Sequence, residues 1–152
     1  MPSNWMSYLV GLALLLVVGG GGYYLVAQKG ATTGDEVAAN WDGLSDDELV
    51  AAASKATTPG STAVVYTNKG FLPSAVTIKL GQKVRFFNQS GEKLWVMQAP
   101  NPGAGNALPE FDQNNNITKG QAWELTFNKV GTFTYLNNSN PKMMGTVTVT
   151  AK

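Results

Sequence analysis

The sequence predicts an all-β fold, a two-sheet sandwich of about seven strands over residues 63–152, preceded by an N-terminal transmembrane helix and a short linker helix. Three observations lead to this prediction. An uncharged apolar run covers residues 6–27, a helix-start pattern covers 44–49, and apolar and polar residues alternate after residue 63. The chain has 152 residues, of which 43% are hydrophobic and 14% charged. It therefore holds one domain of ordinary size and an appendage.

The N-terminal run MSYLVGLALLLVVGGGGYYLVA, residues 6–27, carries no charge and has aromatic residues near both ends. A hydrocarbon core of about 30 Å needs roughly 20 helical residues, so residues 1–29 are predicted to be a single-pass membrane anchor. The four glycines 19–22 weaken a helix in water, but in lipid an unpaired backbone costs more. We expect a protein of the cell membrane whose C-terminal domain is extracytoplasmic, an orientation that the positive-inside rule does not by itself support.

A cleaved signal peptide is the alternative interpretation of this segment, with residues 8–18 as its apolar region. Two features favour the uncleaved anchor. No lysine or arginine precedes the run, and the apolar sequence resumes at 23–27.

Residues 30–62 are predicted to be an acidic stalk that contains a helix over 45–56. Ser45 is the expected N-cap and Glu48, three residues later, its capping-box partner. Leu44 and Leu49 form the accompanying hydrophobic staple, and the sequence around Pro59 ends the helix. The acidic residues here are interpreted as belonging to a soluble helix in a linker, in preference to a metal or partner site.

The domain at 63–152 shows strand periodicity. Alternating apolar residues and β-branched neighbours predict strands, separated by Gly, Asn and Pro, at 63–67, 76–80, 83–86, 94–98, 123–127, 132–135 and 146–150. Residues 99–119 are rich in Pro, Asn and Gly and are too long for a simple turn, so we expect a loop that caps one end of the sandwich. Asp112, residues 114–116 and Glu110 in this loop offer oxygen ligands for a hard cation, but a polar turn region is the preferred interpretation.

The chain contains neither cysteine nor histidine. This excludes a disulfide scaffold, zinc fingers, thiol or imidazole catalysis, and copper or haem sites built on thiolate and imidazole. Glu110 and Asp112 lie two residues apart in a loop, which does not by itself make an acid–base pair, so we expect no enzyme activity. The net charge is +1 and the basic residues are spread singly, which argues against nucleic-acid binding.

Two segments of this domain carry a recognisable pattern. The first is Gly70-Phe71-Leu72-Pro73 followed by residues 76–88, and the second is residues 131–135 followed by Asn140-Pro141-Lys142-Met143-Met144-Gly145 and residues 146–149. They resemble, respectively, the opening and the closing hairpin with its ligand loop of the cupredoxins, the blue-copper or plastocyanin-like proteins. The resemblance covers residues 63–152 and implies a cupredoxin-like Greek-key β-sandwich.

The same resemblance implies a degenerate copper site. The family pattern Tyr-x-Cys-x-x-His-x-x-Met-x-Gly falls on Tyr135, Asn137, Asn140, Met143 and Gly145, and the upstream histidine falls at or next to Leu94. A blue-copper site needs two imidazoles, a thiolate and a long thioether contact, and only the methionine is present. In a comparison with a cysteine-free branch of the family, Leu136 and Asn138 take the histidine places. No metal and no other cofactor is therefore expected.

We expect a binding or structural protein of the cell envelope, with an envelope protein as its partner. The expected docking surface comprises Trp95, Pro100, Pro102 and Pro109, although Trp95 is equally well interpreted as a plug in the core. The alternative function is copper binding or electron transfer through an unconventional Met- and Asn-containing site that includes Met143. That site requires Met97, Met143 and Met144 to converge.

Overall fold

The computed structural model describes residues 15–19, 22–26, 41–100, 103 and 105–152. The chain divides into two compact units, Met1–Gly34 and Asp35–Lys152. In the first unit, strands β1 (Leu15–Gly19) and β2 (Gly22–Val26) pair antiparallel, with Leu15 opposite Val26. The remainder of residues 1–40 lies outside the described residues.

The predicted transmembrane helix over 6–27 is not confirmed. The described part of that range forms the β1–β2 hairpin, and residues 6–14, 20–21 and 27 lie outside the described residues. Hydrophobicity alone does not separate strand from helix in such a run, since it contains both β-branched valines and glycines. In the described part of the chain, no helix combines the length and apolar character that a membrane span needs.

Helix α1 (Asp46–Lys55) begins where the sequence predicts. Glu48 Oε2 accepts hydrogen bonds from the Ser45 backbone N–H at 2.9 Å and from its hydroxyl at 2.8 Å. These bonds hold the pKa of Glu48 below its ordinary value. The first turn is acidic, which complements the positive end of the helix dipole.

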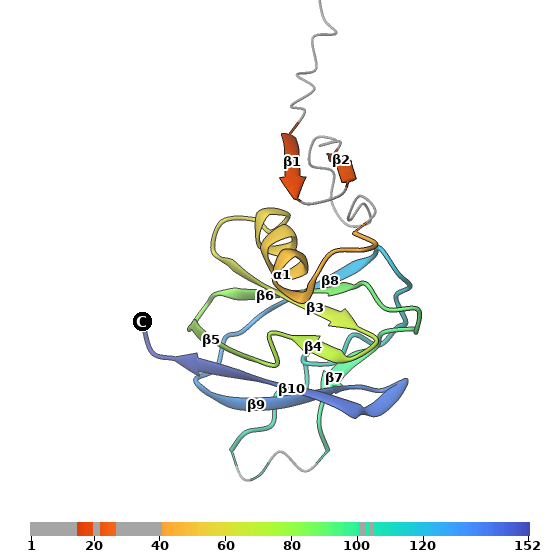
Figure 1. Ribbon diagram of the computed structural model, residues 1–152. Helices are drawn as coiled ribbons and strands as arrows, with labels where there is room; N and C mark the ends of the chain where they lie inside the picture. Colours follow the sequence, from red (N-terminus) through yellow and green to blue (C-terminus); the bar gives the residue numbers. More distant parts are fainter. Residues whose placement is uncertain (1–14, 20–21, 27–40, 101–102, 104) are drawn as a thin grey trace, which may run out of the picture. The chain divides into compact units, whose positions relative to one another are not determined.

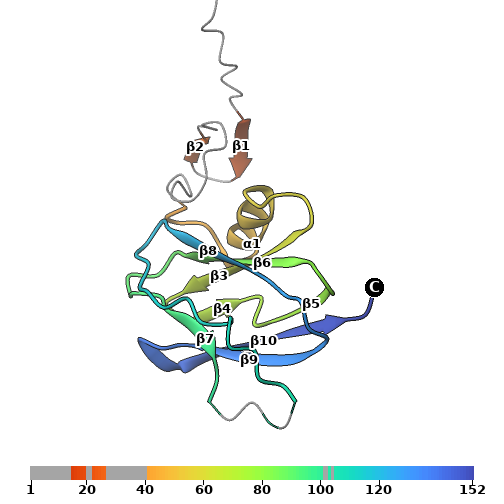
Figure 2. The same ribbon diagram turned by 180° about the vertical axis from the view of Figure 1, so that it is seen from behind.

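Helix α1 is packed against a sheet, which differs from the expected free linker. Leu49 and Ala53 are buried together with Trp41 from the preceding segment and with three sheet residues, Ala63, Val65 and Phe87. The physical reason is that the sheet has a second apolar face, and the helix removes it from water. Figures 1 and 2 show α1 lying over β3 and β6.

The remaining strands form a two-layer sandwich of four-stranded sheets, as the sequence predicts (Figure 1). One sheet has the order β4-β3-β6-β8 and the other β5-β10-β9-β7. The strand bounds are β3 (Ser61–Thr67), β4 (Gly70–Leu72), β5 (Ala75–Lys79), β6 (Lys83–Asn88), β7 (Val96–Gln98), β8 (Ala122–Thr126), β9 (Gly131–Asn137) and β10 (Asn140–Thr150). Both sheets are mixed, because β3 pairs parallel with β6, and β5 pairs parallel with β10.

Two strands differ from the prediction. Strand β4 is a short extra strand that pairs with β3, and β10 starts at Asn140, earlier than the predicted strand. The register of β10 against β9 shifts between Asn140 and Met144, so the segment expected to be a ligand loop is a bulged strand.

Aromatic rings fill the space between the sheets. Tyr135 is fully buried and contacts Phe71 at 4.8 Å and Phe86 at 5.1 Å between ring centroids, in edge-to-face geometry. The other fully buried aromatic side chains of this core are Tyr66, Phe86, Phe111, Phe127 and Phe133, whereas Phe87 lies on the outer face under α1. This packing fixes the closing strands β9 and β10 against the opening strands β4 and β6.

Gly145 is required by the ring of Tyr135. A Cβ at this position would lie 2.4 Å from both the Tyr135 hydroxyl oxygen and its Cζ, and 2.9 Å from the Ser74 carbonyl oxygen. No side chain fits there without a backbone shift. The glycine that ends the family-like pattern therefore has a packing role in this chain.

The two buried tyrosines give a testable contrast. Within the described structure, the Tyr135 hydroxyl has no hydrogen-bond partner, whereas the Tyr66 hydroxyl donates to Glu92 Oε2 at 2.9 Å. Burial raises the pKa of Tyr135, so this hydroxyl stays neutral. We expect Tyr135→Phe to stabilise the protein by about 1 kcal/mol, because it removes an unsatisfied buried polar group.

The control for this prediction is Tyr66→Phe, which should destabilise the protein by about 1 kcal/mol because it removes a bond that is made. Chemical denaturation of both variants measures the two changes. Equal destabilisation by both substitutions would contradict the prediction.

Candidate functional site

Four positions that the family resemblance aligns with copper ligands belong to the end of the sandwich where β9 passes into β10. Asn137 is the last residue of β9 and Asn140 the first of β10, and the two are paired in register. Leu94 lies two residues before β7, the strand that pairs with β9. The structure brings Leu94 and Asn137 together, since the Asn137 side chain bonds to both neighbours of Leu94.

The Asn137 side chain is completely buried, and its amide makes three hydrogen bonds to the main chain. Its Oδ1 accepts hydrogen bonds from the backbone N–H of Trp95 at 2.9 Å and of Ser139 at 3.0 Å. Its Nδ2 donates to the Lys93 carbonyl at 2.9 Å. These bonds tie the 93–95 segment to the β9–β10 turn.

Leu94 fills the position of the upstream histidine with an alkyl side chain. It has no exposed surface and belongs to the main core cluster. Its backbone N–H donates to the Ile117 carbonyl at 2.9 Å, and its carbonyl accepts the Ile117 N–H at 2.8 Å. The leucine side chain therefore packs in the core, and it contains no atom that could ligate a metal.

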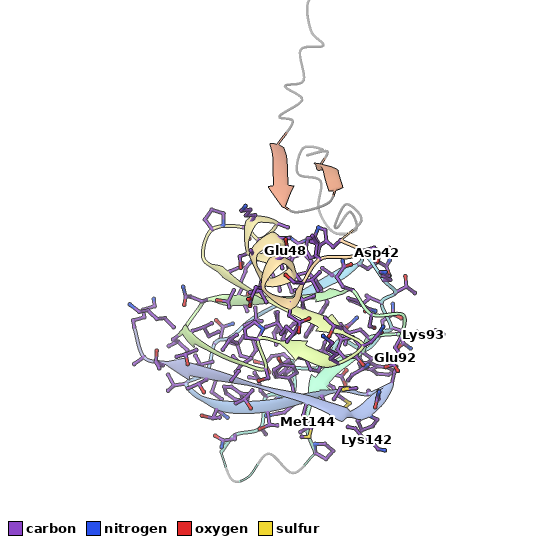
Figure 3. The ribbon with its side chains drawn as sticks, in the orientation of Figure 1. Asp42, Glu48, Glu92, Lys93, Lys142 and Met144 are labelled. Carbon is purple, nitrogen blue, oxygen red and sulfur yellow. The ribbon has the colours of Figure 1, made fainter. Side chains whose placement is uncertain are left out.

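Asn140 and Met143 have different surroundings. Asn140 Nδ2 donates to Glu92 Oε2 at 3.2 Å, the same oxygen that accepts the Tyr66 hydroxyl. Burial raises the pKa of Tyr66. A hydrogen bond with the Asn137 side chain acts in the opposite direction and lowers this pKa by a smaller amount. Met143 packs against the core cluster. Its sulfur lies 3.7 Å from the position that a Cβ on Gly70 would occupy. In the view of Figure 3, Glu92 lies at the same end of the molecule as Met144.

The three methionines of the alternative copper site are divided between two environments. Met97 on β7 and Met144 on β10 are both in register with Leu136 on β9, so Leu136 lies between them in one cross-strand row. Met144 is 48% exposed, whereas Met143 packs on the core. Because successive strand residues face opposite sides of a sheet, the thioethers of 143 and 144 point apart.

Trp95, the centre of the expected docking surface, is half-buried and is neither a free ring nor a simple core plug. Its Nε1 donates to Asp112 Oδ1 at 2.7 Å, and that oxygen also accepts the Asn114 N–H at 2.9 Å. Pro100 and Pro109 are exposed, and Pro102 lies outside the described residues.

The cation hypothesis for the 110–116 loop gains no support. Asp112 Oδ1 is occupied by the two bonds to Trp95 and Asn114. In the part of the chain that the structure describes, no three Asp or Glu side chains are grouped so that they could hold a metal ion.

Sequence reasoning missed Glu92 and Tyr66 as members of this end of the domain. They are 26 residues apart, and Glu92 is 48 residues from Asn140. No local signal could identify them, because only the packing of β3 against the 88–93 turn brings them together.

No protein-family model matches the sequence, and no curated protein matches it. Solved structures do match. A reduced amicyanin variant is 25% identical, with a TM-score of 0.52, over 64% of this chain and 90% of that one. Amicyanin from Paracoccus versutus is 26% identical with the same TM-score, over 64% and 89% of the two chains.

Two further structures support the fold alone. A purple cupredoxin from Nitrosopumilus maritimus is 19% identical, with a TM-score of 0.51, over 58% of this chain and 98% of that one. A copper-containing nitrite reductase from Thermus scotoductus is 20% identical, with a TM-score of 0.52, over 62% of this chain and 23% of that much longer chain.

The hydrogen bonds of Asn137 make a direct prediction. We expect Asn137→Ala to lower the free energy of unfolding by about 2–4 kcal/mol, because it leaves the backbone groups of residues 93, 95 and 139 without partners in a buried place. Asn138→Ala is the matched control, since Asn138 is exposed and uses only its backbone in the bonds described. Chemical denaturation measures both, and a similar small effect of the two substitutions would contradict the structural role.

Proposed function

Because this chain has a cupredoxin-like fold, we propose that it is a copper-free binding module of the cell envelope. In this proposal residues 6–27 hold the chain at the membrane, and the end of the sandwich that contains Trp95 docks an envelope protein. The proposal has three supports: the fold, the chemistry at the four ligand positions, and the composition of the exposed end.

The residues present do not fit type-1 copper. Such a site needs thiolate and imidazole donors, and the chain has none. The observation that carries the proposal is the Asn137 amide at the position that the resemblance aligns with the thiolate: its oxygen accepts two backbone N–H groups and its Nδ2 donates to a backbone carbonyl. An amide held in this way has no lone pair directed at a metal.

The exposed end of the domain supports a docking role. Pro100 and Pro109 are exposed but do not contribute, because the chain runs along β7 from Val96, opposite Asn137, and on to Ala99, which bonds to Thr134 toward the start of β9. The half-buried Trp95 marks the docking end. Lys93 and Lys142 are exposed there, and among the described residues neither takes part in a salt bridge. Figure 3 shows both lysines at the same end of the view. An apolar centre with polar surroundings is typical of transient protein interfaces.

Copper loading tests the first half of the proposal. The full chain is titrated with Cu(I) and Cu(II) in the presence of a competing chelator. We expect no stoichiometric uptake and no strong visible charge-transfer band. The matched variant Leu94→His/Asn137→Cys/Asn140→His, which keeps Met143, supplies two imidazoles, a thiolate and a thioether, and should gain both copper and the band. Strong visible absorption by the unmodified chain would overturn the copper-free proposal in favour of electron transfer.

Site-specific photocrosslinking tests the docking half. A photoreactive residue replaces Lys142, which is exposed at the Trp95 end, in the full chain, and a second variant carries it at Thr77, an exposed residue of β5. In cells that produce the chain natively, we expect a discrete membrane-fraction adduct from position 142 and none from position 77. Identical adduct patterns from both positions, or none from either, would contradict a docking role for this end.

A further inference from the structure

A cleft beside helix α1 adjoins the copper-like end of the domain, since Asn68 in its wall bonds to Gly91, but none of its lining residues is one of the four family ligand positions. Its volume is about 290 Å³. The cleft is formed where the segment leading into α1 meets the β3–β4 turn and two loops of the sandwich. The lining residues are Trp41, Asp42, Gly43, Leu44, Asp46, Leu49, Thr67, Asn68, Lys69, Gln89 and Lys119.

Charges on the walls of the cleft are balanced in pairs. Lys69 Nζ lies 3.4 Å from Asp46 Oδ2, and Lys119 forms an ion pair with Asp42 Oδ1. The described lining residues thus include two ammonium groups and two carboxylates, equal numbers of the two signs. Because these pairs are largely exposed and each contributes little, this equality, and not the strength of the pairs, favours a neutral polar ligand.

Gln89 supplies a second, independent observation. Within the described chain there are five glutamines, and Gln82, Gln98, Gln113 and Gln121 use their side-chain amides in hydrogen bonds to the protein. The amide of Gln89 makes none, although the residue is half-buried in the wall of the cleft. A half-buried amide with unused donors and an unused acceptor is suited to a ligand.

Asn68 adds a free donor to the same wall. Its Oδ1 accepts the Gly91 N–H at 3.0 Å, which fixes the side chain, while its Nδ2 has no partner among the described residues. The apolar part of the lining consists of Leu44, Leu49 and Trp41, and Trp41 packs on Phe87 with 5.5 Å between ring centroids.

We propose that this cleft binds a neutral polyhydroxylated ligand of about one sugar ring. Each hydroxyl group both donates and accepts a hydrogen bond, so it can satisfy a carboxylate, an ammonium group or an amide in turn. The apolar part of the lining matches the C–H face of a sugar ring. The volume lies at the lower end of the range for small-molecule sites, which limits the ligand to a single ring.

The proposal is tested with the full chain, kept in a detergent without a sugar headgroup. The ligands are D-glucose, D-galactose, D-mannose and N-acetyl-D-glucosamine, and saturation-transfer NMR reports binding. We expect transfer to the ring protons of at least one of them. Gln89→Ala should raise its Kd about fivefold, the effect of one lost hydrogen bond. Asn128→Ala, an exposed amide away from the cleft, should leave the Kd unchanged.

Three results would overturn the proposal. One is the absence of transfer to all four sugars. Another is a Kd that Gln89→Ala does not change while the variant keeps the native thermal unfolding midpoint. The third is tighter binding of glucuronate or glucose 6-phosphate than of the neutral sugars, which would show that a charged ligand displaces an ion pair.

Discussion

A buried carboxamide needs hydrogen-bond partners, and the satisfaction of Asn137 organises one end of this domain. Its bonds to the backbone at 93, 95 and 139 join the strand that closes the fold to the segment before β7. That junction fixes Leu94 in the core and sets Trp95 against Asp112. A single side-chain amide thus links the end of β9 to the segment before β7.

The second organising contact is the packing of helix α1 on the outer face of the β4-β3-β6-β8 sheet. The helix and the segment before it cover Val65 and Phe87, and the polar edge of this contact leaves the cleft that contains Gln89. The cleft and the Asn137 junction therefore lie next to each other, joined through the bond between Asn68 and Gly91.

Local patterns in the sequence were sufficient to predict helix α1 and several strands of the fold. The Ser45–Glu48 pattern correctly placed the start of α1, because a capping box involves residues three positions apart. Period-two alternation identified most strands and the two-sheet architecture, since one buried face imposes that period. Other features escaped prediction because they depend on distant partners: the strand β4, the extension of β10 to Asn140, and the packing of α1.

The sequence by itself determined that thiolate and imidazole chemistry is absent, because the chain has no residue that carries either group. It also determined the sandwich, because alternation and turn residues are local signals. Only the tertiary structure decided what replaces the ligands. Two of the three backbone partners of Asn137 lie more than 40 residues away along the chain, and the cleft gathers side chains from four separate segments. Such contacts arise from packing between elements, and no spacing in the sequence encodes them.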